Sequence, residues 1–516
     1  MNVDDFFAHH GITQNPFGAE EARHDPVFER LSHRHNHPQF EKILGSIERP
    51  HTSVVFGEKG AGKTAIRLLI GKCVAKHNRE HPKARTLLVA YDDLNPVLDV
   101  IARNRGTKGR PVNPERLLRN FRLEDHQDAI LALAVTKLVD GLIGAANGPE
   151  AMIMPDGASS RIQEVPRQLR VDLAILAALY DQSRSGGSAD RWRALRRRLK
   201  LGMRLPFSPL KAFATLFTIV AGGGLLGLLA ARMFPRQIDR LPGWVFPVAG
   251  VVAAFAALFW GAWLVRRVQL WRLCRRIKKE MPALDRTALD LGRRISALKP
   301  RDLVDQTWPL PGGDGTNTRY ELTSKLMRVL GAFDYDGLIV LVDRVDEPTL
   351  IAGRPERMQP LVWPMLDSKF LQQERLGLKL LLPLELRYLV LREGEDFFQG
   401  ARLDKQNLVD RLEWSGATLY DLCTDRLRVC HNERESSIGL TDLFDPDVTR
   451  ELIVESLGQM HQPRDAFKLL YSVIQEHCQM VPSEEAKYTI PRLTLEAVRK
   501  DETQRVQELY RGLSPA

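Results

Sequence analysis

A glycine-rich loop of eight residues constrains the fold of this chain more than any other feature. It follows a short apolar, β-branched run, Thr52–Phe56, and its letters are GEKGAGKT. This is the complete G-x-x-x-x-G-K-[ST] pattern, in which glycines let the backbone wrap closely around phosphates and turn its N–H groups inward. The sequence therefore predicts a buried strand, a phosphate-binding loop and a helix in direct succession. The apolar face of that helix is expected to consist of Ile66, Leu69, Ile70, Cys73 and Val74.

Each part of this loop has a chemical task in binding a nucleoside triphosphate. The helix that starts near Gly62 directs the positive end of its dipole at the same anion. Lys63 is expected to reach the β- and γ-phosphates, and the hydroxyl of Thr64 is expected to ligate Mg²⁺. We therefore expect ATP and Mg²⁺ as the bound groups; the alternative is a chance match in a glycine turn. The nucleotide-binding residues on this interpretation are Gly57, Glu58, Lys59, Gly60, Ala61, Gly62, Lys63 and Thr64.

A second apolar run ends in acidic residues that suit the same chemistry. Leu338–Val342 is typical of a buried parallel strand, and Asp343 follows it. Asp343 is placed to hold Mg²⁺ through water, as a Walker B aspartate does. Asp346 and Glu347 come in the next turn, and one of them is expected to orient or deprotonate the attacking water. The alternative is a buried strand that ends in a solvated acidic turn.

Two long runs without a charged residue, 212–231 and 241–265, separate the loop from the acidic turn. A helix needs about 20 apolar residues to cross the hydrocarbon core of a bilayer, and both runs reach that length. Trp244, Trp260 and Trp263 lie near the ends of the second run, where aromatic belts form. The runs therefore predict a membrane hairpin; the alternative is a buried helical hairpin in a soluble core.

The basic surplus of the chain lies beside these two runs. The net charge is +10, and the flanking segments Arg191–Lys211 and Arg266–Lys279 hold eight and seven basic residues and no acid. Subtracting these fifteen charges from +10 leaves −5 for the rest of the chain, which argues against nucleic acid as the partner. By the positive-inside rule, both flanks are expected in the cytoplasm, together with both termini and the nucleotide site.

The cysteines and histidines show no pattern of a disulfide or metal site. Five cysteines without disulfide or zinc spacing fit a reducing cytosol. His33, His35 and His37 cluster, but we interpret them as loop histidines rather than metal ligands. The remaining expected elements are strands at 86–91, 376–382 and 408–414 and helices at 39–47, 114–143, 171–180 and from 462 onward.

The order of these features resembles the KAP family of P-loop NTPases, in which membrane helices interrupt the nucleotide domain. The form hhhhD-x-h-D-E at Leu338–Glu347, where h is apolar, is similar to the broader STAND branch of the AAA+-like ATPases. Gln462-Pro463-Arg464-Asp465 before an apolar helix is similar to the lid of both groups. Asn15-Pro16-Phe17 is similar to the openings of some bacterial AAA+ ATPases. The resemblance implies that Arg464 touches the γ-phosphate from the lid.

The chain departs from this family in three places. KAP members usually carry Asp-Asp-x-Asp-Arg at Walker B, whereas this chain has DRVDE from Asp343. Pro383 follows the strand at 376–382, which leaves Glu385 or Arg387 as the candidates for the sensor-1 position. An arginine finger is not identified.

These observations predict an α/β fold, in which a helical transmembrane hairpin interrupts the parallel sheet of a P-loop NTPase and a C-terminal α-helical lid follows. The expected segments are 1–145 and 301–435 for the NTPase domain, 146–300 for the insertion and 436–516 for the lid. The chain is expected to be an ATPase in the inner membrane with two spans. Its expected partners are the lipid bilayer, further copies of itself and a protein effector.

The expected function is that of a nucleotide-driven switch in bacterial signalling or antiviral defence. The alternative is a motor or assembly ATPase that serves a membrane secretion or surface system. A nucleic-acid-handling ATPase tethered to the membrane is disfavoured by the charge of −5 outside the basic flanks. A transporter is also disfavoured, because two spans without an intramembrane charge offer no ion path to a single copy.

Overall fold

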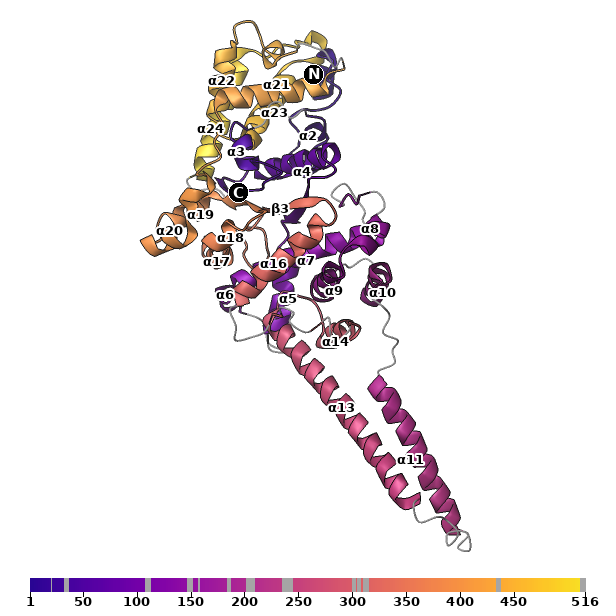
Figure 1. The fold of residues 1–516 in the computed structure, drawn as a ribbon. Helices are drawn as coiled ribbons and strands as arrows, with labels where there is room; N and C mark the ends of the chain where they lie inside the picture. The colour runs from indigo at the N-terminus through magenta and orange to yellow at the C-terminus, as the bar shows by residue number, and fades with distance from the viewer. Residues whose placement is uncertain are drawn as a thin grey trace. The chain divides into compact units, whose positions relative to one another are not determined.

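The computed structural model describes most of the chain (Figure 1). His33, His35, Trp244 and most of the connector expected between the apolar runs lie outside the described residues. The described residues are 1–19, 21–31, 37–106, 113–145, 152–155, 158–182, 187–200, 209–233, 245–298, 303, 308–309, 315–432 and 438–510.

The chain divides into two compact units. The first comprises Met1–Pro96, Asn113–Phe121 and Asp334–Ala516, and the second comprises Val97–Val112 and Arg122–Phe333. These units differ from the segments expected from the sequence. The last part of the expected segment 1–145 belongs to the second unit, and residues 436–516 are not set apart from the sheet.

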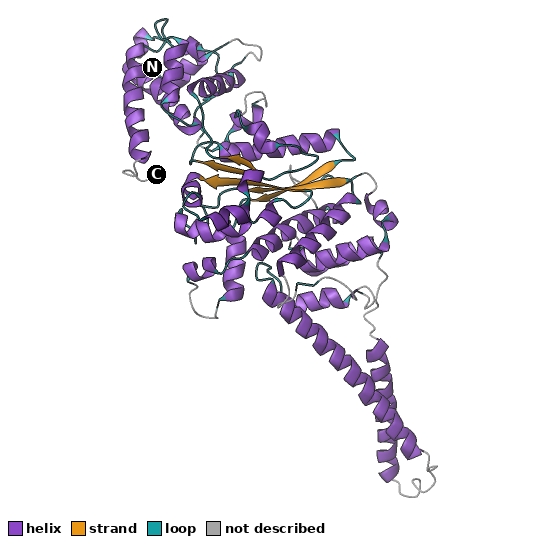
Figure 2. Ribbon diagram, turned by 60° about the vertical axis from the view of Figure 1, so that its left-hand side comes forward, coloured by secondary structure: helices purple, strands orange, loops and turns teal. Residues whose placement is uncertain are grey.

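A parallel sheet forms the centre of the first unit (Figure 2). Its five strands are hydrogen-bonded in the order β2-β3-β4-β1-β5. The expected α/β class with a parallel sheet is therefore confirmed. The expected strand at 408–414 is shorter, because the ladder with β1 ends at Val409. The strands are β1 (Ser53–Gly57), β2 (Arg85–Tyr91), β3 (Tyr335–Val342), β4 (Leu376–Pro383) and β5 (Asn407–Val409).

The pairing register brings the carboxyl ends of four strands to one edge of the sheet. The last residue of β1 is level with the last residue of β4, and Tyr91 at the end of β2 is level with Val342 at the end of β3. Asp92 and Asp343 come next along their chains, so two carboxylates leave adjacent strands at the same level. In open parallel sheets, ligands bind outside the carboxyl ends of the strands.

One face of the sheet is covered by three helices, α2 (Pro26–Arg30), α3 (Phe40–Leu44) and α4 (Lys63–Glu80). Alternate residues of the strands point to this face, as the two-residue period of a strand requires. The helix expected at 39–47 ends early, because Gly45 adopts φ +61° and closes it. The core on this face includes Val55, Ile339, Leu341 and Leu381 from the strands and Ile66, Leu69, Ile70 and Val74 from α4.

A helical part of the first unit joins the two ends of the chain. Its elements share one apolar core, in which Phe6 and Phe7 of the N-terminal helix are buried against the C-terminal helices. Thr13 donates its N–H to the carbonyl of Cys430 at 2.8 Å. This helical part is therefore larger than the expected segment 436–516: it begins near residue 416 and includes the first residues of the chain. Its helices are α1 (Val3–His9), α21 (Gly416–Cys430), α22 (Arg450–Gly458), α23 (Pro463–Met480) and α24 (Arg492–Tyr510).

The second unit is helical in its described residues. The single helix expected at 114–143 is interrupted, because the carboxylate of Asp125 accepts the N–H of Arg122 at 2.9 Å and starts a new helix there. Helix α9 contains the expected helix at 171–180. The larger helices of this unit are α7 (Leu123–Ile143), α9 (Arg167–Tyr180), α10 (Ser188–Leu199), α14 (Ala288–Ser296) and α16 (Gly315–Gly331).

A fully buried ion pair ties three of these helices together. Arg319 of α16 donates through Nε and Nη2 to the two carboxylate oxygens of Asp128, at 3.1 and 3.0 Å. The hydroxyl of Tyr180 donates to the same carboxylate at 2.8 Å. Arg319 Nη2 also donates to the carbonyl of Glu280 at 3.0 Å. Helices α7, α9 and α16 and the residue Glu280 are therefore joined at one point.

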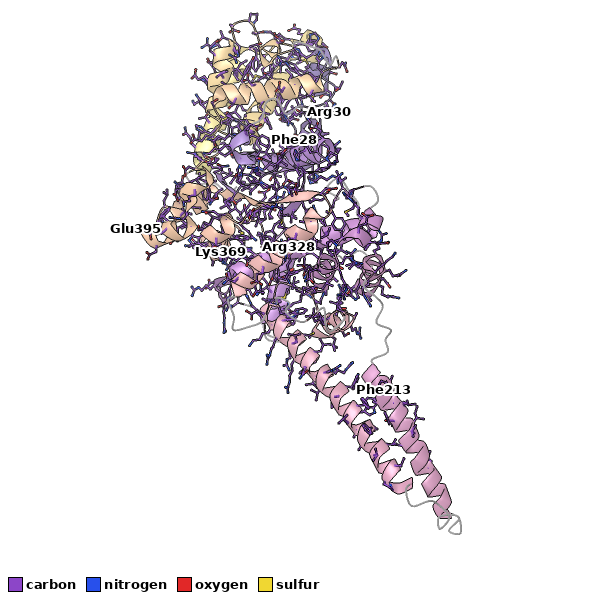
Figure 3. All side chains as sticks on the ribbon, in the orientation of Figure 1. Phe28, Arg30, Phe213, Arg328, Lys369 and Glu395 are labelled. Atoms are coloured by element: carbon purple, nitrogen blue, oxygen red, sulfur yellow. The ribbon has the colours of Figure 1, made fainter. Side chains whose placement is uncertain are left out.

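Two long apolar helices of the second unit lie side by side (Figures 1 and 2). They are α11 (Pro209–Met233) and α13 (Val245–Glu280). Phe213, labelled on α11 in Figure 3, stacks on Phe259 of α13 with ring centroids 5.6 Å apart. The indole of Trp260 donates to the hydroxyl of Thr218 at 3.0 Å.

One of these helices passes the length and composition test for a membrane span. Among the described residues, Pro247–Glu280 is the single helix that is long and apolar enough to cross a bilayer, and 6% of its most apolar window is buried. The described apolar part of α11, Ala212–Gly224, is shorter than a span. Helix α13 also continues well beyond the expected end at residue 265.

Short helices complete the two units. The α-helices among them are α5 (Asn95–Arg105), α6 (Pro114–Arg119), α8 (Ala158–Glu164), α17 (Pro355–Val362), α18 (Ser368–Leu371), α19 (Leu384–Val390) and α20 (Glu395–Ala401). The 3₁₀ helices are η1 (Ala22–His24), η3 (Trp363–Met365), η4 (Leu403–Lys405), η5 (Leu440–Leu443) and η6 (Ser483–Glu485).

Candidate functional site

The loop of residues 57–64 connects β1 to α4 at the carboxyl edge of the sheet. Gly60 and Gly62 adopt φ +104° and +95°, a region that side chains with a Cβ rarely enter. A Cβ on Gly60 would also lie 2.9 Å from Gln462 Oε1 and 3.2 Å from Arg464 Cβ. The backbone of this loop therefore requires glycine, both for its conformation and for its close approach to the start of α23.

Lys63 folds back over the loop in this structure. Its ammonium donates to the carbonyls of Gly57 and Glu58 at 2.7 and 2.8 Å. Burial lowers the pKa of Lys63, while the charges of Asp343, Asp346 and Glu385 raise it. The loop thus holds a positive charge inside its own turn, at the place where a phosphate would approach the backbone N–H groups.

Thr64 and Asp343 meet at this edge although 279 residues separate them along the chain. The Thr64 hydroxyl donates to Asp343 Oδ2 at 3.2 Å, and Asp343 Oδ1 accepts the N–H of Arg344 at 2.9 Å. Burial raises the pKa of Asp343, and the charges of Arg67 and Lys63 lower it. A hydroxyl beside a carboxylate is the hard oxygen donor set that Mg²⁺ prefers, so these two residues fit the expected metal.

The two candidates for the base differ in their surroundings. Glu347 is 53% exposed and forms an ion pair with Arg344 at 3.2 Å. Burial raises the pKa of Glu347, Arg344 lowers it, and the neighbouring Asp346 raises it further. Asp346 acts on Lys63 through its charge. Both carboxylates line the same cavity as the loop, so the structure brings both to the site.

Arg464 stands at the first turn of α23, after Gln462 and Pro463. It lines the cavity together with Lys63, and its charge lowers the pKa of Lys63, which shows that the two cations are close. Its Nε is buried without a hydrogen-bond partner within the described part of the chain. The start of α23 therefore presents a cation to the glycine-rich loop.

A cavity of about 340 Å³ extends from the loop into the helical part of the same unit. Beyond the loop and the acidic turn, its walls are largely aromatic and aliphatic. Phe28 of α2, labelled in Figure 3, forms part of this wall. The further walls of the cavity include Leu31, Trp414, Leu422, Arg426 and Phe467.

Trp414 and Arg426 are site residues that the sequence analysis did not identify. The indole of Trp414 donates to the loop carbonyl of Ala61 at 2.9 Å. Arg426 is buried, donates to the carbonyl of Pro16 at 2.7 Å and pairs with Asp25 at 2.6 Å. Neither belongs to a motif of fixed spacing. The one available signal is that Trp414 is the last residue of the strand predicted at 408–414.

The two sensor-1 candidates have different partners. Arg387 pairs with Asp410 at 2.6 Å, whereas Glu385 acts on Lys63 through its charge. Glu385 is exposed and is not among the residues that line the cavity. His37, the described member of the histidine cluster, donates through Nε2 to the carbonyl of Glu413 at 2.8 Å. No metal-binding group of three or more His, Cys, Asp or Glu residues occurs among the residues that the structure describes.

Comparison with known proteins leaves the site to be interpreted from its own geometry. No family model, no curated protein and no solved structure matches this chain.

Proposed function

We propose that this chain is an ATP-binding and ATP-hydrolysing P-loop NTPase of the AAA+-like kind, anchored in a membrane. The observation that carries the proposal is the meeting of Thr64 with Asp343 at 3.2 Å. These two residues come from the two separate motifs that such a site requires. The glycine-dependent loop conformation and the cation of Arg464 at the same cavity support it.

In the proposed mechanism, the backbone N–H groups of the loop and the ammonium of Lys63 bind the phosphates. Thr64 and Asp343 would hold Mg²⁺, and the ion would neutralise charge that develops on the phosphoryl oxygens. Asp346 or Glu347 orients or deprotonates the attacking water. Arg464 reaches the γ-phosphate from the lid, so that binding of ATP draws the lid to the loop.

The membrane part of the proposal rests on α11 and α13. Both are apolar over long stretches, and exposed side chains on them include Ile219, Leu226 and Leu258. Such surfaces are rare on soluble monomers, and the basic flanks suit a cytoplasmic membrane face. We propose two spans in a bacterial inner membrane, with a nucleotide-driven switch for signalling or antiviral defence as the function. A motor or assembly ATPase would use the same site.

Substitution of Lys63 tests the nucleotide site. Lys63→Ala should abolish ATP binding, because the phosphates lose their main cation. Isothermal titration of the detergent-solubilised chain measures this, with Lys83→Ala, an exposed lysine outside the loop, as the control. Equal ATP affinity in the parent and the Lys63 variant would refute the assignment.

Fractionation tests the anchor. The chain should stay in the membrane pellet after a carbonate wash, and deletion of 212–265 should give a soluble protein that still binds ATP. A cysteine placed at Gln237 should react with a membrane-impermeant thiol reagent in intact cells, whereas one beside Lys200 should not. The reverse pattern of labelling would overturn the topology.

A further inference from the structure

Arg67 lies one turn beyond Thr64 on α4 and belongs to no recognised motif. It is 5% exposed. Its Nη1 donates to Asp92 Oδ2, and its Nε lies 3.6 Å from Asp343 Oδ2. Arg23 donates to the same oxygen of Asp92. Four side chains of alternating charge therefore run from the surface to the candidate metal ligand.

The pairing of β2 with β3 brings two carboxylates together, and a cation between them offsets their repulsion. Asp92 and Asp343 follow residues that are paired across β2 and β3, so two carboxylates face the same small space. Two like charges at close range repel, and burial strengthens the repulsion because the local dielectric is low. The guanidinium of Arg67 stands between the two carboxylates and removes that repulsion without any bound metal.

The contact between Arg67 and Asp343 is electrostatic and is not closed by a hydrogen bond. Arg67 Nε has no hydrogen-bond partner within the described residues. Asp343 Oδ2 accepts its hydrogen bond from Thr64 instead. Asp343 Oδ2 is therefore already shared between a hydroxyl group and a fixed positive charge.

We propose that Arg67 makes metal binding depend on nucleotide, because its guanidinium takes the place of a cation between Asp92 and Asp343. A divalent ion that approaches Asp343 alone meets a like charge at short range. Phosphate oxygens bring their own negative charge and further ligands, so Mg²⁺ enters together with ATP. Arg67 is thus a positioning residue, and the inference rests on the proposed nucleotide site.

Binding of Mn²⁺ in the absence of nucleotide tests this role. The parent chain should bind Mn²⁺ tightly with ATP present and only weakly without it, as followed by the paramagnetic resonance signal of free Mn²⁺ against a protein-free sample of the same Mn²⁺ and ATP content. Arg67→Met should gain nucleotide-free Mn²⁺ binding by roughly tenfold, because loss of a unit charge near 4 Å changes an ion's affinity severalfold even at the dielectric constant of water. Arg67→Lys keeps the charge and should behave as the parent.

Two matched variants separate the role of Arg67 from that of its neighbours. Arg23→Met removes the other partner of Asp92 but leaves Arg67 in place, so no gain is expected. Arg67→Met combined with Asp92→Asn should lose the gain, since one carboxylate of the facing pair is then neutral.

Several outcomes would overturn the inference. One is a parent chain that binds Mn²⁺ as tightly without ATP as with it, a result that needs no folded variant. Another is an Arg67→Met protein with native circular dichroism and no gain. If the parent chain bound no ATP, and no Mn²⁺ in the presence of ATP, the proposed nucleotide site itself would be refuted, and this inference with it.

Discussion

Each unit buries an arginine beside acidic side chains, and the two arginines are bonded differently. Arg319 in the helical unit is fully buried and bonds both oxygens of Asp128 and a backbone carbonyl. Arg67 at the edge of the sheet bonds Asp92 but faces Asp343 through charge alone. A closed pair fixes the elements that carry it. An open pair brings opposite charges together without fixing the carboxylate by a hydrogen bond from the guanidinium.

Burial raises the pKa of the acidic partner at both sites, Asp128 and Asp343. Burial opposes the charge of Arg319, but Asp128 outweighs it and raises the pKa of the guanidinium. At the sheet edge, burial raises the pKa of Asp343 even though Arg67 and Lys63 lie close. The helical unit thus uses its ion pair to hold helices together, whereas Asp343 at the sheet edge receives no hydrogen bond from Arg67 Nε.

The largest expected effect on stability comes from removing the carboxylate of Asp128, which pairs with the buried Arg319. Asp128→Ala leaves Arg319 buried and unpaired, which typically costs about 3–5 kcal/mol. Thermal unfolding of the detergent-solubilised chain measures the loss. Asp285→Ala is the matched control, since the pair of Asp285 with Arg103 has both side chains more than 60% exposed and should be worth about 0–1 kcal/mol. Similar losses of stability in the two variants would show that the buried pair contributes no more to stability than the exposed pair.

A buried lysine in the sheet provides a third arrangement, in which carbonyls replace carboxylates. Lys379 of β4 donates to the carbonyls of Leu44 and His51, both at 2.8 Å, and to the hydroxyl of Ser53 at 3.2 Å. Burial lowers the pKa of Lys379 to about 7. Between this value and the ordinary lysine pKa near 10.4, the unfolded chain binds more protons than the folded one. The stability of the parent chain should therefore rise with pH across this window.

Lys379→Met tests this dependence. The variant should lack the rise above pH 7, and at pH 10 it should be less stable by about 1–3 kcal/mol because buried carbonyls lose their donor. Urea denaturation from pH 7 to pH 10 gives both quantities, with the exposed Lys83→Met as the control. Parallel stability curves for the parent and the Lys379 variant would show that the lysine stays charged throughout.

The smallest expected effect concerns the loop itself. Trp414→Phe removes the hydrogen bond to the Ala61 carbonyl, which is worth about 0.5–1.5 kcal/mol. ATP affinity should fall severalfold by isothermal titration. Trp363→Phe is the matched control, since its indole bonds Glu393 at 2.8 Å and lies outside the cavity wall. An equal change in ATP affinity for the two variants would show that the hydrogen bond of Trp414 to the loop does not contribute to ATP binding.

Local signals in the sequence located the elements around the loop correctly. A β-branched run before glycines and an apolar helix face after them are contiguous, so β1 and α4 lie where the sequence predicts them. The apolar run before Asp343 is equally local. Both sequence signals need only the alternation or continuity of apolar residues within a few turns.

What the sequence could not show depends on contacts between distant segments. Arg67 reaches Asp92 and Asp343 only because β2 and β3 are neighbours in register. Likewise, the packing of α1 with the C-terminal helices follows from buried phenylalanines whose partners lie more than 400 residues away. The break between α6 and α7 depends on a single capping carboxylate, Asp125, inside a segment with continuous apolar periodicity.

The continuity of helix α13 fixes the rotation of its apolar residues about the helix axis relative to its C-terminal end. It runs for 36 residues, about 54 Å at 1.5 Å per residue, with no proline after Pro247. Its last carbonyl, that of Glu280, is held by Arg319. In an uninterrupted helix, the direction in which each side chain points about the axis is fixed relative to the helix ends. A single alanine inserted between Arg266 and Cys274 would therefore turn the whole apolar face by about 100° relative to that fixed end, without altering one apolar side chain.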